Sequence, residues 1–78
     1  MAEIWQEQDD RGRAVTFTSK GRDHILQRRP EMAGRLDEVR TAIGDPTLVT
    51  RDALYSRREN YYLRTAAEPG WIKVVVNY

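Results

Sequence analysis

The chain has no cysteine, three prolines and a single histidine. Without cysteine it has no disulfide framework and no thiolate metal site, which excludes a small secreted fold held by disulfides and makes a cytoplasmic location the expectation. The longest apolar run, Val74 to Val76, is too short to cross a bilayer, and residues 1–10 lack the pattern of a signal peptide. No membrane association is therefore expected.

The chain also has little net charge. Thirteen lysines and arginines are nearly balanced by twelve acidic residues, which leaves a net charge of +1. This balance is unlike that of a dedicated duplex-binding domain. All basic residues except Lys20 and Lys73 are arginines, whose planar fork fits phosphate or carboxylate, although a genome-wide codon bias is the favoured explanation of such a count. With 78 residues, of which 40% are hydrophobic and 32% charged, we expect one small globular domain over residues 1–78.

The periodicity of the chain predicts strands at both ends and helices between them. Alternating and β-branched residues predict strands over residues 4–8, 13–18, 47–51, 60–65 and 72–78. Polar turns at 9–12 and 66–70 close two hairpins. The last strand is apolar on both faces at Val74 to Val76, which favours a central position in a sheet or a seam between two copies of the chain.

Two helices are predicted between the hairpins. The first begins near Lys20, with Thr18 or Ser19 as its N-cap, and ends before Pro30. The second covers residues 33–43, where apolar residues recur at intervals of three and four, and Gly44-Asp45-Pro46 stops it. The order β-β-α-α-β-β-β predicts an α+β domain with the helices packed on one face of an antiparallel sheet.

His24 is the first candidate for acid–base chemistry, because histidine is the side chain that changes charge near neutral pH. Lys20, His24 and Arg28 follow one another at intervals of four and share one face of the predicted helix, where they could hold a phosphate. The alternative is a surface or capping histidine. A single histidine also makes a metal site unexpected.

Tyr62 and Arg64 are candidates for nucleic-acid contact. Alternation along the predicted strand places both on one face, where a tyrosine can stack on an unpaired base beside a phosphate-binding arginine. The alternative is a strand-forming tyrosine beside an arginine that covers the sheet surface. The chain has no serine nucleophile motif and no phosphate-cradling glycine loop, and the Asp9-Asp10 pair is explained by solvation in a turn.

Several short stretches together resemble a known family: Asp23 to Leu26, Arg29 to Gly34, Asp45-Pro46, Tyr61-Tyr62 and Lys73 to Val76. Over residues 13–78 the chain resembles the phage- and mobile-element-associated domains of the barnase, EndoU, colicin and RelE-like (BECR-type) nuclease superfamily. The resemblance implies helices packed on a four-stranded antiparallel sheet and metal-independent RNA cleavage. It makes His24 the acid or base and matches Tyr62 and Lys73 to motif positions. Arg29 stands where relatives carry a second histidine, and the final strand of the family lies beyond Tyr78.

These observations leave two hypotheses. The first is a toxin-like ribonuclease with His24 and Lys73 as catalytic residues and with Arg28, Arg64 and Tyr62 binding the RNA, without metal or cofactor. The second is a non-catalytic phage or mobile-element accessory protein that binds another protein through a nuclease-like scaffold. The net charge favours the second, because phosphate neutralisation supplies much of the affinity for RNA. A homodimer through the C-terminal strand is compatible with both.

Overall fold

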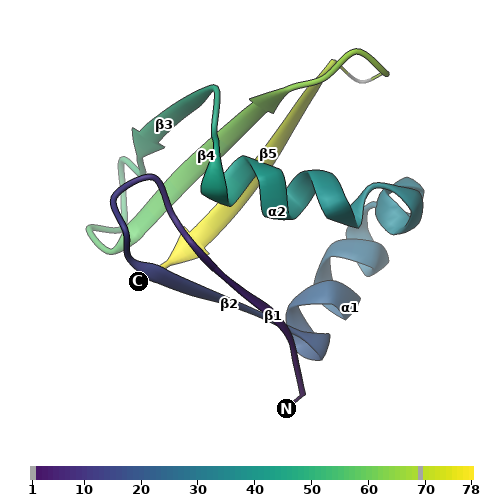
Figure 1. The fold of residues 1–78 in the computed structure, drawn as a ribbon, viewed down its shortest axis with the longest axis horizontal. Coiled ribbons are helices and arrows are strands. Elements are labelled where there is room, and N and C mark those ends of the chain that lie inside the picture. The colour runs from purple at the N-terminus through teal and green to yellow at the C-terminus, as the bar shows by residue number, and fades with distance from the viewer. Residues whose placement is uncertain (1, 69) are drawn as a thin grey trace.

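The computed structural model describes residues 2–68 and 70–78, and its fold class is α+β with the predicted order β-β-α-α-β-β-β (Figure 1). Its elements are β1 (Glu3–Gln8), β2 (Ala14–Thr18), α1 (Ser19–Arg28), the 3-10 helix η1 (Pro30–Gly34), α2 (Leu36–Gly44), β3 (Leu48–Arg51), β4 (Arg58–Arg64) and β5 (Trp71–Asn77). Within the described residues, the strands form two antiparallel sheets, β1-β2 and β3-β4-β5, where a single sheet is predicted. No helix in this part of the chain is long and apolar enough to span a membrane.

The β1-β2 hairpin closes at a turn that depends on Asp9 and Gly12. The Asp9 carboxylate accepts hydrogen bonds from the backbone N–H groups of Arg11 and Arg13, each at 2.8 Å. Gly12 has a φ of +80°, a conformation that glycine adopts without a steric penalty. The predicted turn at 9–12 is therefore present, and its acidic residue holds the backbone of the turn together.

Thr18 begins α1. Its hydroxyl accepts a hydrogen bond of 3.1 Å from the backbone N–H of Gly21, so Thr18 is the N-cap of the two residues predicted for that role. The helix ends at Arg28, two residues before Pro30, because proline cannot continue a helix. None of the residues of α1, all of which are described, is fully buried.

The second predicted helix is shorter than expected, because residues 30–34 form the 3-10 helix η1 and α2 starts only at Leu36. Arg35 separates the two with a φ of −129°. Its guanidinium donates hydrogen bonds to Glu38 Oε1 at 2.7 Å, to Thr65 Oγ1 at 3.0 Å and to the carbonyl of Glu68 at 2.7 Å. The contacts with Thr65 and Glu68 tie the start of α2 to the segment that follows β4.

In the three-stranded sheet β4 is central and β5 lies at the edge, so the central position predicted for the last strand is wrong. Tyr61 of β4 and Ile72 and Val76 of β5 are buried on the face that α2 covers. Val75 points to the opposite face and is 46% exposed. The run of valines therefore consists of a half-buried Val74 and a buried Val76 on either side of the exposed Val75, and not of a strand covered on both faces.

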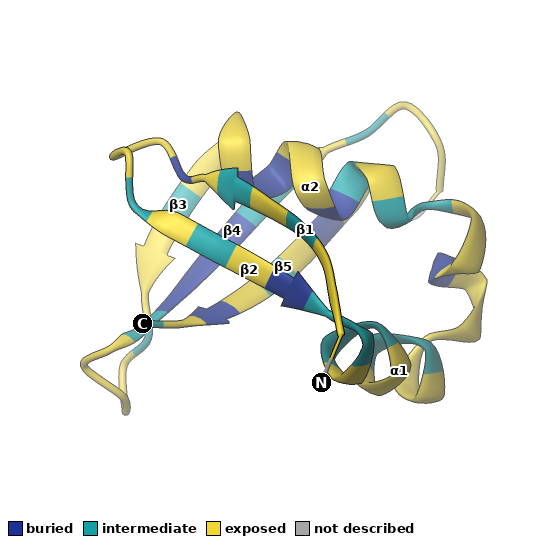
Figure 2. Cartoon of the chain, turned by 60° about the horizontal axis from the view of Figure 1, so that its bottom comes forward, coloured by how far each residue is buried: buried dark blue, intermediate teal, exposed yellow. Residues whose placement is uncertain are grey.

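The core lies between the hairpin, α2 and the three-stranded sheet. Val39 and Ile43 of α2 are 2% and 1% exposed, and Trp5 of β1 packs against both core clusters that these residues belong to. Figure 2 shows the buried residues gathered on α2, β4 and β5, while α1 carries exposed and intermediate residues. The hairpin and the sheet are thus joined mainly through α2.

Candidate functional site

The face of the three-stranded sheet opposite α2 is open, and it carries three of the residues predicted for the site. Tyr62 of β4 lies directly across from Lys73 of β5, and Arg64 lies across from Trp71. The Arg64 guanidinium is 6.0 Å from the centre of the Trp71 ring, and Trp71 is 49% exposed. Two aromatic side chains and two cations therefore share a solvent-facing patch.

A hollow of about 610 Å³ lies between α1 and β5, and we call it the α1–β5 hollow. His24 and Arg28 line it from α1, and Lys73 lines it from β5. The spacing of four along α1 turns His24 and Arg28 toward the same side of the helix. The structure thus brings together three of the five predicted site residues, from segments about 50 residues apart in the sequence.

The α1–β5 hollow is rich in positive charge. Arg28, Arg29 and Lys73 line it, whereas Glu31 is the one carboxylate among its lining residues in the described chain and lies 3.9 Å from Arg29. His24, Arg28 and Lys73 are all exposed to solvent. A histidine beside two exposed cations is an arrangement that can hold a phosphate and exchange a proton next to it.

Tyr62 and Arg64 do not line this hollow, but they adjoin it. Tyr62 neighbours Lys73 across the β4-β5 ladder, and Arg64 neighbours Trp71, which lines the hollow. A single strand that passed over the edge of β5 could therefore place a phosphate in the hollow and a base against the open face. Tyr62 and Arg64 are thus linked to the hollow through the β5 residues paired with them, Lys73 and Trp71.

A second hollow, of about 740 Å³, lies between β2 and β5, and we call it the β2–β5 hollow. All five residues of β2 line it, opposite residues 74–78. Core residues Val39 and Ile43 form part of its floor, and Lys20 and His24 line it from α1. In Figure 1 the two strands lie closest near the C-terminus and diverge toward α1. His24 lies where the two hollows meet.

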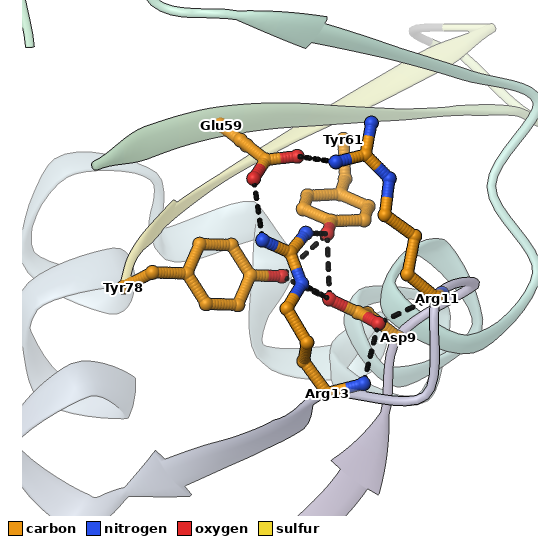
Figure 3. Close-up of polar contacts among 6 residues, drawn as sticks. All are labelled: Asp9, Arg11, Arg13, Glu59, Tyr61 and Tyr78. Atoms are coloured by element: carbon orange, nitrogen blue, oxygen red, sulfur yellow. Dashed lines mark hydrogen bonds and ion pairs between the residues drawn. The ribbon is translucent and has the colours of Figure 1, made fainter. Parts of the chain in front are cut away.

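Sequence reasoning missed a third polar site, a cluster that fastens the hairpin turn to the sheet (Figure 3). We call it the Asp9 cluster: Asp9, Arg11, Arg13, Glu59, Tyr61 and Tyr78. Asp9 Oδ2 accepts hydrogen bonds from Arg13 Nε at 2.7 Å and from the hydroxyls of Tyr78 at 2.6 Å and Tyr61 at 3.2 Å. Arg13 also donates to Glu59 Oε2 at 2.8 Å, and its guanidinium lies 3.9 Å from the centre of the Tyr78 ring. The hydroxyls of Tyr61 and Tyr78 contact each other.

In this cluster the pKa values of the carboxyl groups are lowered and the pKa of the Tyr78 phenol is raised. Burial raises the pKa of Asp9, but hydrogen bonds from Tyr78, from the backbone N–H groups of Arg13 and Arg11 and from the Arg13 guanidinium outweigh it and hold that pKa far below its usual range. The hydrogen bond from Arg13 lowers the pKa of Glu59 in spite of its burial. Burial, followed by the contacts with Asp9 and Tyr61, raises the pKa of Tyr78. The cluster is therefore fixed as charged carboxylates and neutral phenols.

The solvated turn expected for Asp9 is a wrong prediction, because Asp9 is 5% exposed and its carboxylate is enclosed by the cluster. The sequence did carry one signal. Alternation along β4 places Glu59 on the same face as Tyr61 and Leu63, and an acid on a buried face needs a cationic partner. Nothing local identifies Arg13 as that partner, because it lies 46 residues away.

Among residues 2–68 and 70–78, no three histidine, cysteine or acidic side chains come together in a way that could hold a metal ion. Comparison of the chain with known protein families, curated proteins and solved structures finds no match. The geometry of the hollows and of the open sheet face is therefore the basis on which a function is assigned.

Proposed function

We propose that this chain is a metal-independent endoribonuclease that binds single-stranded RNA across the edge of β5. The observation that carries the proposal is that His24, Arg28 and Lys73, chosen from the sequence for acid–base and phosphate-binding roles, line one hollow. Tyr62 and Arg64 adjoin it on the open sheet face. The cytoplasmic location expected from the absence of cysteine belongs to the same proposal, since it would place the domain with cellular RNA.

The chemistry needs a base, an acid and charge stabilisation. The neutral imidazole of His24 takes the proton from a ribose 2′-hydroxyl, whose oxygen then forms a bond to phosphorus. The phosphorus–oxygen bond to the 5′-oxygen breaks, and the ammonium of Lys73 gives that oxygen a proton. Arg28 neutralises the charge on the equatorial phosphate oxygens. The products are a 2′,3′-cyclic phosphate and a free 5′-hydroxyl. Side chains supply the base, the acid and the charge stabilisation, so the proposed route uses no metal or cofactor.

The open face supplies binding in this proposal. A base stacks on Tyr62 or Trp71, which stand diagonally on neighbouring strands, while Arg64 meets the adjoining phosphate. Stacking accepts any base, so the preference for sequence is weak. This division puts most of the affinity on the open face of β4 and β5 and puts proton transfer in the α1–β5 hollow, between His24 of α1 and Lys73 of β5.

The direct test is cleavage of a 5′-labelled single-stranded RNA in the presence of EDTA, by the parent chain and by His24→Ala. The parent cleaves it, and removal of the proton-transfer group lowers the rate by about 100-fold or more. Arg22→Ala is the matched control, because Arg22 is on α1 but does not line the hollow. Its Nε donates a hydrogen bond of 3.3 Å to Asp23 Oδ1. An inert parent, or equal rates for His24→Ala and the parent, contradicts the assignment.

The second candidate is a non-catalytic protein that binds another protein, as phage and mobile-element accessory proteins do. One observation favours it specifically: β5 presents a free strand edge beside a hollow that reaches the core. A parent chain that is as inert toward RNA as His24→Ala would leave this candidate and remove the catalytic role of His24.

A further inference from the structure

The backbone of β5 has a free hydrogen-bonding edge. The N–H of Tyr78 donates to the carbonyl of Arg57, and the N–H of Thr65 donates to the carbonyl of Gly70, both at 2.7 Å. The direction of the backbone N–H and C=O groups alternates along an antiparallel strand. The backbone groups of the even-numbered residues of β5 therefore point toward β4 and form hydrogen bonds with it. The odd-numbered residues Lys73, Val75 and Asn77 therefore direct N–H and C=O groups away from β4, toward an edge with which no strand of the described residues pairs.

β2 presents a second free edge on the other side of the β2–β5 hollow. The carbonyl of Arg13 accepts a hydrogen bond from the N–H of Asp9, and the N–H of Ser19 donates one to the carbonyl of Ala2, both at 2.8 Å. The backbone groups of the odd-numbered residues of β2 therefore point toward β1. Ala14 and Thr16 accordingly direct their backbone groups outward, and both line the hollow. Two strand edges thus border one hollow whose floor includes the core residues Val39 and Ile43.

The size of the β2–β5 hollow fits one strand. A strand of five residues fills a slab about 16 Å long, 4.8 Å wide and 10 Å thick, or about 800 Å³. The hollow measures about 740 Å³. In a second copy of the chain, β5 is already paired to β4. Such a copy would bring a sheet to this edge, and a sheet is wider than a single strand. The hollow therefore favours an isolated extended segment.

The charge of the hollow indicates what the segment carries. Lys20 and His24 line the end of the hollow at α1, and no acidic residue is among the described residues that line it. A carboxylate at that end would meet a cation without competition. A nucleic-acid backbone fits less well, because the strand edges present carbonyl oxygens as well as N–H groups, and carbonyl oxygens repel phosphate.

We propose that the β2–β5 hollow binds an extended segment of a partner protein, which pairs antiparallel with the free edge of β5. The segment places apolar side chains over Val39 and Ile43 and an acidic C-terminal end between Lys20 and His24. This is the β-augmentation mode of recognition, in which backbone hydrogen bonds supply affinity and alternate side chains supply specificity. It is a protein-binding site that shares His24 and part of β5 with the α1–β5 hollow, but it does not require the proposed ribonuclease activity.

The test uses a fluorescein-labelled peptide with five alternating valines and threonines followed by two glutamates. The peptide binds the parent chain saturably, and a version ending in two lysines binds about tenfold more weakly at low salt. Lys20→Glu reverses this preference between the two peptides. Hydrogen exchange followed by NMR shows slower exchange of the Val75 and Asn77 amides when the peptide is bound. No saturable binding at millimolar concentration, or no protection of these two amides, overturns the proposal.

Val75→Pro isolates the backbone contribution, because the N–H of Val75 points to the free edge and its loss leaves the β4-β5 hydrogen bonds in place. It weakens peptide binding by about tenfold, the cost of one lost backbone hydrogen bond, whereas the control Val75→Thr binds as the parent does. If Val75→Pro fails to fold by circular dichroism, the amide protection in the parent chain decides the question. Protection of the same amides by a uridine oligonucleotide instead of the peptide, or by self-association without peptide in sedimentation experiments, overturns the proposal in favour of RNA or of a homodimer.

Discussion

The Asp9 cluster and the α1–β5 hollow both contain arginines, at the two ends of β5, but the two regions surround them differently. Arg13 meets two carboxylates at 2.7 and 2.8 Å and lies over the ring of Tyr78. Arg28 is exposed beside His24 and Lys73. The cluster pairs its carboxylates with arginines inside the fold, although Glu59 Oε1 accepts no hydrogen bond and has only Arg11 at 3.9 Å, while the charges of the hollow face solvent. The comparison teaches that the partners of an arginine, more than its presence, separate a structural role from a binding role.

Asp9→Ala is expected to have the largest effect on stability. It removes a buried carboxylate and leaves the two phenols and the Arg13 guanidinium without their shared acceptor, which costs about 3 kcal/mol of unfolding free energy. Urea denaturation measures the change. Asp10→Ala at the exposed neighbouring position is the control and changes the free energy of unfolding by less than about 0.5 kcal/mol. Equal effects of the two substitutions would mean that the cluster does not hold the hairpin to the sheet.

The cluster also predicts how stability depends on pH. The pKa values of Asp9 and Glu59 are lowered in the folded chain, so the unfolded chain binds more protons in acid. Their stabilisation is complete above about pH 5 and is lost as the pH falls below the ordinary carboxyl values toward the lowered ones. Urea midpoints between pH 2 and pH 7 measure this loss, and Asp9→Asn flattens it. A pH-independent midpoint in the parent chain would refute the account of the cluster.

At the other end of β5, Tyr62→Ala tests the stacking role of the open face. Loss of one base–aromatic stack weakens binding of single-stranded RNA by about tenfold, and Tyr62→Phe retains the binding because it retains the ring. Fluorescence anisotropy with a labelled uridine oligonucleotide that carries 2′-deoxyribose and cannot be cleaved measures both variants. A loss of affinity in Tyr62→Phe as large as that in Tyr62→Ala would indicate that stacking is not the contribution of this residue.

On RNA binding, as distinct from cleavage, Lys73→Ala has the smallest expected effect and acts through charge. Removing one phosphate contact makes the dependence of log affinity on log salt concentration shallower by about 0.7 for a single strand. Arg22→Ala leaves that slope unchanged, because Arg22 lies outside the hollow. Titrations of the same oligonucleotide at several salt concentrations give the slopes. Identical slopes for the parent and Lys73→Ala would remove Lys73 from the RNA path.

The local features of the fold were predictable from the sequence, because short-range chemistry determines them. The Thr18 cap, the stop before Pro30 and the alternation in β4 each depend on residues within one turn of helix or one strand. The grouping of His24 with Arg28 also follows from helical spacing. Lys73 joined them only through the family resemblance, since nothing local links β5 to α1.

Features that depend on long-range contacts were not predictable. The edge position of β5 is set by the order of strands in space, which the run of valines does not encode. The buried state of Asp9 depends on Tyr61 and Tyr78, which lie 52 and 69 residues away in the sequence. Arg35, where η1 gives way to α2, likewise contacts Thr65, which lies 30 residues away in the sequence. Tertiary contacts override local preference at each of these positions.

The measurement that tests the central claim most directly is NMR mapping of an isotope-labelled chain titrated with a uridine oligonucleotide that carries 2′-deoxyribose and cannot be cleaved. The account predicts concentration-dependent shifts at His24, Arg28 and Lys73, with smaller ones at Tyr62 and Arg64, and unchanged signals at Arg13 and Glu59. Shifts confined to residues outside the hollow and the open face, or no shifts at all, would contradict it.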